Sequence, residues 1–343
     1  MSSNNQTSEM EDLSPESIAA CIVLSLASVI GIPGNLVVIW SICGILKSCS
    51  CTTILILNLA FADLIVLATL PIWIYSFADH WVFGVTFCKA LVYLIYSSMY
   101  VSLFLITLMS IERYLAVFQP FALQKWDRQK VFLKVIIIIW ILAAMFGIQI
   151  LPFQKTHEVE GRLQCTLRDY KSSGQKIACL VFETLFGFFI PFGIICTCYV
   201  CLRMRIQKIN YKAKQKSDAL IASVIIAFCL CWIPHHICNL LDIFSVLFET
   251  SHPDLSSTLE EITETGATIS GALTFLSSCV NPILYAFAAR KFRSHTRFNQ
   301  LVKLFENVAT LEPSQNPKRE TEGTQTDNSN DMGVIELQDI LKL

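Results

Sequence analysis

The sequence predicts an all-α membrane protein built as a bundle of seven transmembrane helices. The chain has 343 residues, of which 54% are hydrophobic and only 15% are charged, and its mean hydropathy is +0.55. A soluble globular protein carries about 25% charged residues. Seven apolar segments are each long enough to cross a bilayer as a helix, at residues 18–46, 53–78, 88–118, 131–153, 177–202, 219–248 and 265–289.

The distribution of Lys and Arg predicts how these helices are oriented. Neither residue occurs in 1–46 or 217–289, whereas basic residues follow the third, fifth and seventh segments. Because cytosolic loops are enriched in Lys and Arg, we expect a multi-pass plasma-membrane protein whose N-terminal tail, 1–17, is extracellular and whose C-terminus is cytosolic. Asn5 begins a glycosylation sequon, which agrees with this orientation, although such triplets also arise by chance.

The third segment is the one around which the others are expected to pack. Twenty-two residues between Lys89 and Glu112 carry no charge, which corresponds to about 33 Å of helix. Cys88 marks its outer end. Cys88 and Cys165 are the cysteines expected at or beyond the outer surface, so they are the natural disulfide pair in an oxidising compartment. Most of the other cysteines lie in the segments and read as small apolar packing residues.

The regions after the fifth and seventh segments indicate contacts with the membrane and with cytosolic proteins. The basic run 208–216 either attracts anionic lipids and a protein partner or is a solvated helix end. Residues 290–305 alternate basic and apolar side chains, which predicts a short amphipathic eighth helix on the membrane surface. Residues 306–343 predict a disordered cytoplasmic tail, a substrate for receptor kinases that arrestin would read.

Polar and proline motifs recur at fixed places in these segments. Asp63 lies in the middle of the second segment, where a carboxylate is costly and therefore a functional candidate. Together the motifs resemble the rhodopsin-like (class A) G-protein-coupled receptors over residues 18–305. They comprise Asn35, Asp63, Cys88, Glu112-Arg113-Tyr114, Trp140, Pro191 with Tyr199, Cys231-Trp232-Ile233-Pro234 and Asn281-Pro282-Ile283-Leu284-Tyr285.

Further stretches are similar to the leukotriene B4 receptors. They are Ser98-Met99-Tyr100-Val101-Ser102, Leu115-Ala116-Val117 with Pro120-Phe121, Phe182-Glu183-Thr184, His236 with Asn239-Leu240, Phe275 to Pro282 and Leu304-Phe305-Glu306. This resemblance implies a receptor for an extracellular lipid mediator with a role in chemotaxis. It also implies activation of a heterotrimeric G protein, of the inhibitory class, by outward movement of the sixth segment.

The family resemblance implies roles for two sets of core residues. One set resembles an allosteric sodium site, the one cofactor expected; the alternative is a hydrogen-bonded network of water. Its members are Asp63, Asn35, Ser102, Ser278 and Asn281. The other set would couple the ligand to the G protein, with a kink at Pro234 and a cation at Arg113. Its members are Glu112, Arg113, Tyr114, Tyr199, Phe228, Trp232, Pro234 and Tyr285. Lys214 stands where many relatives carry the acid that locks Arg113 at rest.

The resemblance also implies a ligand pocket between the third, fifth, sixth and seventh segments. Its predicted lining suits a hydroxylated fatty acid, with Glu183 as a partner for a ligand hydroxyl; the alternative for Glu183 is an internal hydrogen bond to His236 or another neighbour. Ile95 replaces the Asp of amine receptors and Phe275 replaces the Lys of opsins. The predicted ligand contacts are Tyr96, Met99, Tyr100, Arg168, Glu183, Trp232, His235, His236 and Asn239.

One departure leaves the ligand open. Where the leukotriene B4 receptors offer basic residues, this chain has Val92, Gln154 and Ala267, so the available cations are Lys89, Lys155 and Arg168. The acidic link after the sixth segment would instead attract a cationic peptide, so a chemoattractant or peptide receptor of the same fold is the alternative. An ion-coupled transporter is a weaker one. No nucleophile–base pair or metal-ligand spacing predicts an enzyme, and no basic stripe predicts nucleic-acid binding.

Overall fold

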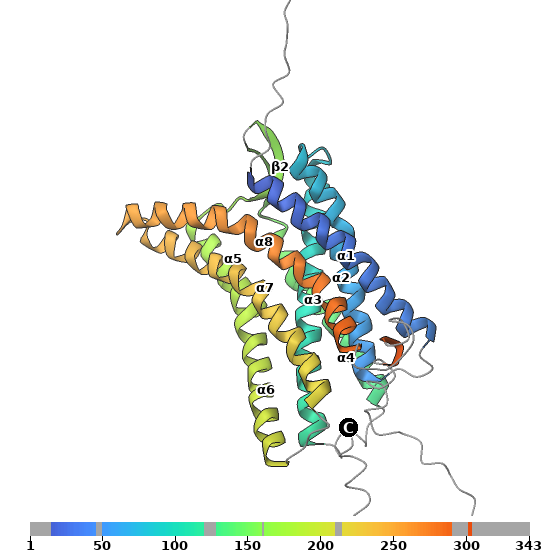
Figure 1. Cartoon of the computed structure of the whole chain (residues 1–343). Helices are drawn as coiled ribbons and strands as arrows, with labels where there is room; N and C mark the ends of the chain where they lie inside the picture. Colours follow the sequence, from blue (N-terminus) through green and yellow to red (C-terminus); the bar gives the residue numbers. More distant parts are fainter. Residues whose placement is uncertain are drawn as a thin grey trace, which may run out of the picture.

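A computed structural model describes residues 15–45, 50–119, 128–159, 161–209, 215–289 and 301–303, and within them the protein is helical apart from one β-hairpin (Figure 1). Seven helices in this part are long and apolar enough to cross a membrane. The fifth span is divided into three elements, so α8 is the seventh span. The elements are α1 (Pro15–Ile45), α2 (Cys51–Ala78), α3 (Gly84–Phe118), α4 (Arg128–Gly147), η2 (Ile148–Ile150), β1 (Gln154–Val159), β2 (Arg162–Arg168), α5 (Ser173–Thr184), η3 (Leu185–Phe189), α6 (Ile190–Ile209), α7 (Gln215–Phe248) and α8 (Pro253–Ala289).

The third span, α3, is central, as its uncharged sequence predicts. It contacts α2, α4, α6 and the strand β1, and buried side chains cover its length from Cys88 to Glu112. Close packing needs small residues: a Cβ added to Gly147 of α4 would lie 2.3 Å from Ser97 Oγ and 3.2 Å from the Ser97 backbone nitrogen of α3. Any larger side chain at this glycine would push the two helices apart.

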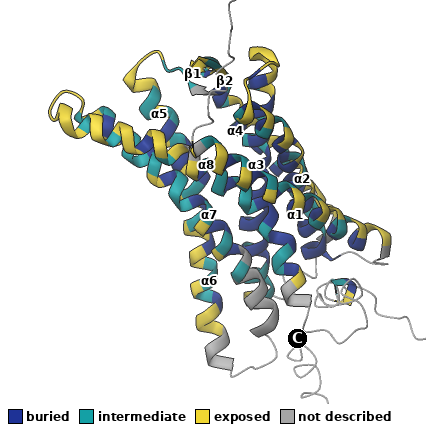
Figure 2. Cartoon of the chain, turned by 45° about the horizontal axis from the view of Figure 1, so that its top comes forward, coloured by how far each residue is buried: buried dark blue, intermediate teal, exposed yellow. Residues whose placement is uncertain are grey.

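Burial follows the pattern expected of helices that face lipid on one side. Large apolar side chains lie exposed along α1, α4 and α7, for example Val29, Ile137 and Leu230. The buried core lies where the helices face one another, as the dark ribbon of Figure 2 shows. In lipid, exposed apolar side chains carry no penalty, and the helices satisfy their own backbone hydrogen bonds.

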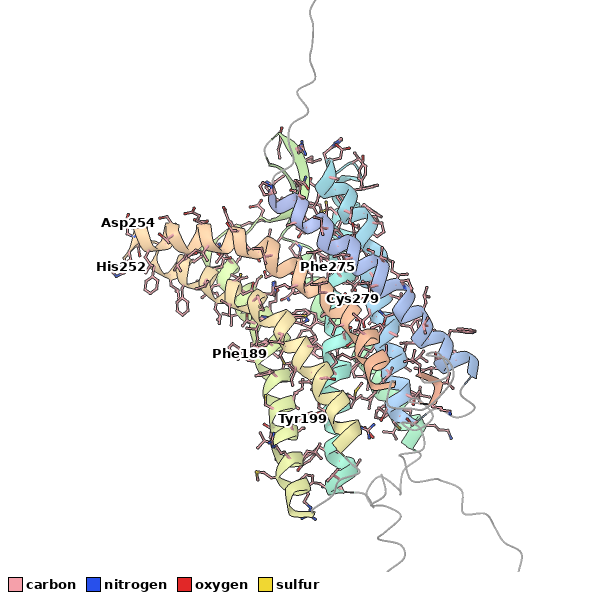
Figure 3. All side chains as sticks on the ribbon, in the orientation of Figure 1. Phe189, Tyr199, His252, Asp254, Phe275 and Cys279 are labelled. Carbon is pink, nitrogen blue, oxygen red and sulfur yellow. A yellow bond between two sulfur atoms is a disulfide. The ribbon has the colours of Figure 1, made fainter. Side chains whose placement is uncertain are left out.

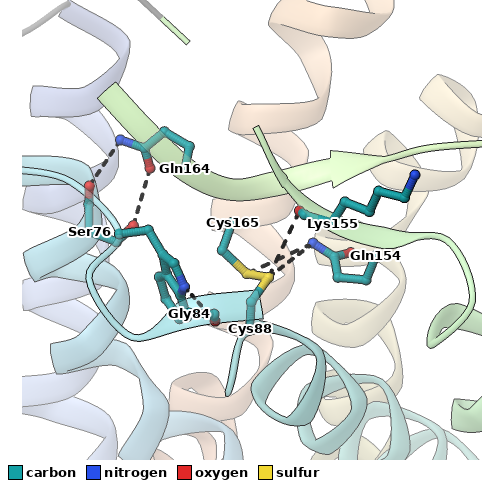
Figure 4. The surroundings of a disulfide bond; sticks show 8 residues. Ser76, Gly84, Cys88, Gln154, Lys155, Gln164 and Cys165 are labelled. Atoms are coloured by element: carbon teal, nitrogen blue, oxygen red, sulfur yellow. Dashed lines mark hydrogen bonds between the residues drawn. A yellow bond between two sulfur atoms is a disulfide. The ribbon is translucent and has the colours of Figure 1, made fainter. Parts of the chain in front are cut away.

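The β-hairpin closes one end of the bundle and is tied to α3 (Figure 4). β1 pairs with β2 in antiparallel register, and a disulfide joins Cys88 at the start of α3 to Cys165 in β2. The amide nitrogen of Gln154 lies 3.7 Å and 3.9 Å from the two sulfur atoms. Gln164 hydrogen-bonds Ser76 through both its amide oxygen and its amide nitrogen, which fixes the hairpin to α2 as well. We refer to this end as the disulfide end and to the opposite one as the Arg113 end.

The fifth span contains a bulge just before Pro191. The bulge is the five-residue π-helical element η3, which ends two residues before the proline. Because Pro191 has no N–H, the preceding turn lacks a donor and can accommodate an extra residue. Phe188 in η3 stacks on His236 of α7, with ring centroids 4.9 Å apart. The bulge therefore places Phe188 against α7.

The seventh span is much longer than predicted. The sequence predicts a start at 265, whereas α8 begins at Pro253 and has 37 residues. Pro253 suits the first helical position, and Asp254 in the first turn favours the helix dipole. The acidic residues of 253–264 predict that this stretch does not cross the membrane. It is nevertheless helical, as the first part of α8, and α8 packs on α7. At their tips α7 and α8 extend away from the rest of the bundle, and His252 and Asp254 lie at the far end (Figure 3).

Other boundaries differ by smaller amounts. α1 and α4 begin three residues earlier than predicted, and α3 begins at Gly84, before Cys88. The predicted amphipathic helix at 290–305 falls outside the described residues except for a helical fragment at 301–303. The N-terminal sequon at Asn5, residues 210–214 of the basic run 208–216 (Lys214 among them), and the tail 306–343 also lie outside them.

Candidate functional site

Three polar centres lie along the inside of the bundle. One is at the disulfide end around Glu183, one is in the middle around Asp63, and one is at the Arg113 end around Glu112. Each contains a buried carboxylate, and burial of a charge is costly unless the charge is paired and hydrogen-bonded. The partners of each carboxylate therefore show what the centre can do.

The centre at the disulfide end is an ion-paired cluster. Arg168 Nη1 donates a hydrogen bond of 2.8 Å to Glu183 Oε2, and His235 Nε2 lies 2.7 Å from Glu183 Oε1. The guanidinium of Arg168 lies over the ring of Tyr96, 5.1 Å from its centroid, which is cation–π geometry. Three chain segments, β2, the fifth span and α7, thus meet at one carboxylate.

The charge of Arg168 is secured by this environment. Its side chain is 19% exposed and that of Glu183 is 6% exposed. Burial lowers the pKa of Arg168, but the carboxylate of Glu183 and the hydroxyl of Tyr170 more than offset this and raise the pKa above its usual value. The guanidinium is therefore a permanent cation inside the disulfide end of the bundle.

The other predicted ligand contacts surround this cluster to different degrees. Tyr100 accepts a hydrogen bond from Gln149 at 3.1 Å, and Asn239 Nδ2 lies 3.5 Å from Thr184 Oγ1. His236 is buried and stacks on Trp232, with ring centroids 5.8 Å apart. Met99 is partly buried and packs against the cores of both halves of the bundle. The alternative partner of Glu183, His236, forms no hydrogen bond with it among the described contacts; Arg168 and His235 take that place.

The three positions that lack the expected basic residues are structural or remote. Val92 is buried beside Ile95 in the core at the disulfide end. The side-chain amide of Gln154 contacts both sulfur atoms of the disulfide, and Ala267 is exposed. The Lys155 side chain forms an ion pair with Asp169 at the surface, and its hydrogen bond holds the pKa of that carboxyl below its usual range. The sequence predicts Arg168 and Glu183 as separate ligand contacts. It does not predict their ion pair, because the two residues lie in different elements.

The middle centre contains Asp63 with neutral partners. Asn281 Nδ2 donates to Asp63 Oδ2 at 2.8 Å, and Ser102 Oγ donates to Oδ1 at 3.4 Å. Ser278 lies beside the same carboxylate. Asn35 is one step removed: its Nδ2 donates to the Ser278 backbone oxygen at 3.0 Å. Its buried Oδ1 has no hydrogen-bond partner within the described part of the chain. The set of oxygen atoms around one carboxylate fits a hard monovalent cation.

The switch residues lie between the middle and the Arg113 end. Pro234 lies inside α7, and Trp232 stacks on Phe228 one turn away, with ring centroids 5.3 Å apart. Tyr285 is buried and Tyr199 is partly buried against the same core. Tyr114 stacks on Phe118 at 4.5 Å. Arg113 and Glu112 form a charged pair, with Arg113 Nε 3.5 Å from Glu112 Oε2.

Comparison with known proteins identifies the family of this chain. Residues 34–285 match the family model described as 7 transmembrane receptor (rhodopsin family). The chain is 33% identical over 278 residues to Chemerin-like receptor 2 of Mus musculus, covering 80% of this chain and 76% of the relative. It is 32% identical over 295 residues to Leukotriene B4 receptor 1 of Homo sapiens and 35% identical over 296 residues to that of Rattus norvegicus, each covering 86% of this chain and 83% of the relative.

These matches cover most of the chain and include the motifs described above. The family consists of receptors and not of enzymes, and its members are multi-pass proteins of the plasma membrane that respond to a ligand and act on a G protein. The chain belongs to the rhodopsin family of seven-transmembrane G-protein-coupled receptors.

Proposed function

We propose that this receptor binds an anionic lipid mediator, leukotriene B4 or a related hydroxy fatty acid, through Arg168. The observation that carries the proposal is the partly buried guanidinium on the face of Tyr96, paired with the buried carboxylate of Glu183. A ligand carboxylate would take over one side of the guanidinium fork. The Glu183 carboxylate, still held by His235, would then accept a hydrogen bond from a ligand hydroxyl. The similarity to Leukotriene B4 receptor 1 supports the same ligand class.

In this proposal the disulfide end is extracellular and the Arg113 end is cytosolic. Movement of the Arg113 end of α7 about Pro234 exposes Arg113 to a G protein of the inhibitory class.

Sodium at Asp63 stabilises the resting state, with Ser102, Ser278, Asn281 and Asn35 as the other polar groups. Kinases and arrestin act on the tail, anionic lipids bind near 208–216, and Asn5 carries the glycan.

A ligand panel on transfected cells tests the proposal. Calcium and cAMP responses would be measured for leukotriene B4, its methyl ester, other hydroxy fatty acids and chemoattractant peptides. We expect a response to a free hydroxy acid that is lost on esterification and lost in Arg168→Gln at equal surface expression. Lys155→Gln is the matched control, because this cation pairs with Asp169 at the surface, and should respond like the wild type. A response to peptides alone would overturn the lipid proposal.

A peptide ligand is the second candidate, and a specific surface favours it. The tips of α7 and α8 present exposed carboxylates and lie apart from the bundle (Figure 2). No Lys or Arg occurs between residues 217 and 289 to neutralise them along the chain. A cationic peptide would be attracted to this arm. The exposed acids are Glu249, Asp254, Glu260, Glu261 and Glu264.

A further inference from the structure

The Glu112–Arg113 pair at the Arg113 end has a further partner that the motif does not contain. Thr52 lies in the first turn of α2, which begins at Cys51, and is 2% exposed. Its hydroxyl donates to Glu112 Oε2 at 3.3 Å and accepts a hydrogen bond from Arg113 Nη2 at 3.1 Å. One hydroxyl therefore bridges the anion and the cation of the pair.

A hydroxyl is suited to this part because it can donate and accept at the same time. A threonine hydroxyl has one hydrogen to donate and lone pairs that accept, so it can satisfy a carboxylate and a guanidinium at the same time. Hydrogen bonds to charged groups are stronger than those between neutral groups. The side chains of Glu112 and Arg113 are 5% and 16% exposed, so water competes weakly for these bonds.

The N-terminus of α2, which carries Thr52, is fixed by a helix cap and by packing on α3. Ser50 caps the N-terminus of α2: its Oγ accepts from the Thr53 backbone nitrogen at 3.1 Å and lies 2.9 Å from the Thr53 hydroxyl. One turn further, Leu55 and Leu59 of α2 share a buried core with Ile106 of α3. Thr52 is thereby held at a fixed height beside Glu112 and Arg113.

We propose that Thr52 is a positioning residue that holds Arg113 in its resting orientation, so that α2 supplies a restraint on this side chain. The inference rests on the proposed role of Arg113 as the G-protein contact. It follows that release of Arg113 requires the side chain to leave Thr52 and Glu112, and is separate from the movement of α7. Activation would then have two steps, the opening of α7 and the freeing of Arg113.

Basal signalling without ligand tests this proposal. Nucleotide exchange would be measured on membranes across a panel of Gα subunits, at matched surface expression, for wild type, Thr52→Val, Thr52→Ser and Thr53→Val. Thr52→Val keeps the shape and removes both hydrogen bonds, and a lost bond to a charged group shifts an equilibrium roughly tenfold. We expect basal exchange to rise at least about fivefold in Thr52→Val, and Thr52→Ser to restore the wild-type level.

Thr53→Val is the matched control, because it makes the same change one residue away and affects only the contact with Ser50. It should leave basal exchange unchanged. Basal exchange in Thr52→Val that equals or falls below that of Thr53→Val overturns the proposal, as does failure of Thr52→Ser to restore it. A separate arm, Arg113→Ala with leukotriene B4 and the peptide panel, addresses the role of Arg113 itself. If that variant still activates the G protein, the proposed function of Arg113 fails, whatever Thr52 does.

Discussion

Glu183 and Asp63 are both buried carboxylates of the same bundle, yet their environments differ in charge. Glu183 faces a guanidinium at 2.8 Å and a histidine at 2.7 Å. Asp63 receives hydrogen bonds from the Asn281 amide and the Ser102 hydroxyl, and no Lys, Arg or His in the described ranges forms an ion pair with it. Because a buried charge needs a counter-charge, Glu183 is neutralised by the protein whereas Asp63 needs a cation or a proton from outside.

This difference in charge compensation suits the two centres to different ligands. At Glu183 a ligand must compete with a partner that is already in place, so binding is an exchange of ion pairs and favours a ligand that supplies both an acid and a hydrogen-bond donor. At Asp63 an ion meets no competing cation in the described part of the chain. The first centre is suited to selecting among ligands, and the second is suited to sensing an inorganic cation.

The largest effect is expected when the pair at Glu183 is broken. Arg168→Ala should lower the free energy of unfolding by about 3–5 kcal/mol, because it leaves a buried carboxylate without its cation. Thermal unfolding of the purified receptor in detergent measures this. The double variant Arg168→Ala with Glu183→Ala should recover most of the loss. If the double variant is no more stable than the single one, Glu183 is not charge-compensated and the comparison fails.

Removal of the disulfide tests how far the disulfide end depends on its covalent tie. Cys88→Ser with Cys165→Ser releases two residues that are 77 apart in sequence and should cost about 2–4 kcal/mol. The hairpin that carries Arg168 would loosen, so the response to an acidic ligand should weaken. The sodium dependence of thermal stability that we propose for Asp63 should persist. Its loss would show that the two centres are coupled.

Asp63→Asn removes the uncompensated charge and keeps the hydrogen-bonding shape. In the wild type, sodium at ten times its Kd should add about 1.4 kcal/mol of stability by mass action. The variant should show no such increase, and potassium at the same ionic strength is the control in both. Thermal stability measured against sodium concentration decides this. Equal behaviour of sodium and potassium in the wild type would favour a hydrogen-bonded water network instead of an ion.

The smallest effect is expected at a more exposed pair. Lys176 Nζ lies 2.7 Å from Asp242 Oδ1, joining α5 to α7, and both side chains are about one quarter exposed. Lys176→Ala should cost about 0.5 kcal/mol, because solvent and side-chain entropy offset most of the attraction. Exchange of the two residues, Lys176→Asp with Asp242→Lys, should be near neutral. A loss as large as that in Arg168→Ala would show that burial is not what distinguishes the two ion pairs.

Much of the fold followed from composition and spacing. The seven apolar segments predict the seven spans, and the absence of charge from Lys89 to Glu112 predicts the central place of α3. The start of α8 could not be read in this way, because residues 253–264 are acidic and become helical by packing on α7 and extending beyond the span. Hydropathy predicts which residues lie in lipid, and it does not predict how far a helix continues beyond the membrane.

The sequence by itself determined which residues carry charge into the bundle: Asp63, Glu112, Arg113 and Glu183 are visible as isolated polar residues in apolar segments. Only the tertiary structure decided their partners. Arg168 reaches Glu183 because the disulfide and the hairpin bring β2 over the fifth span, and Thr52 reaches Glu112 and Arg113 because α2 packs beside α3. Hydropathy is a property of one segment, whereas compensation of a buried charge depends on contacts between segments distant in the chain.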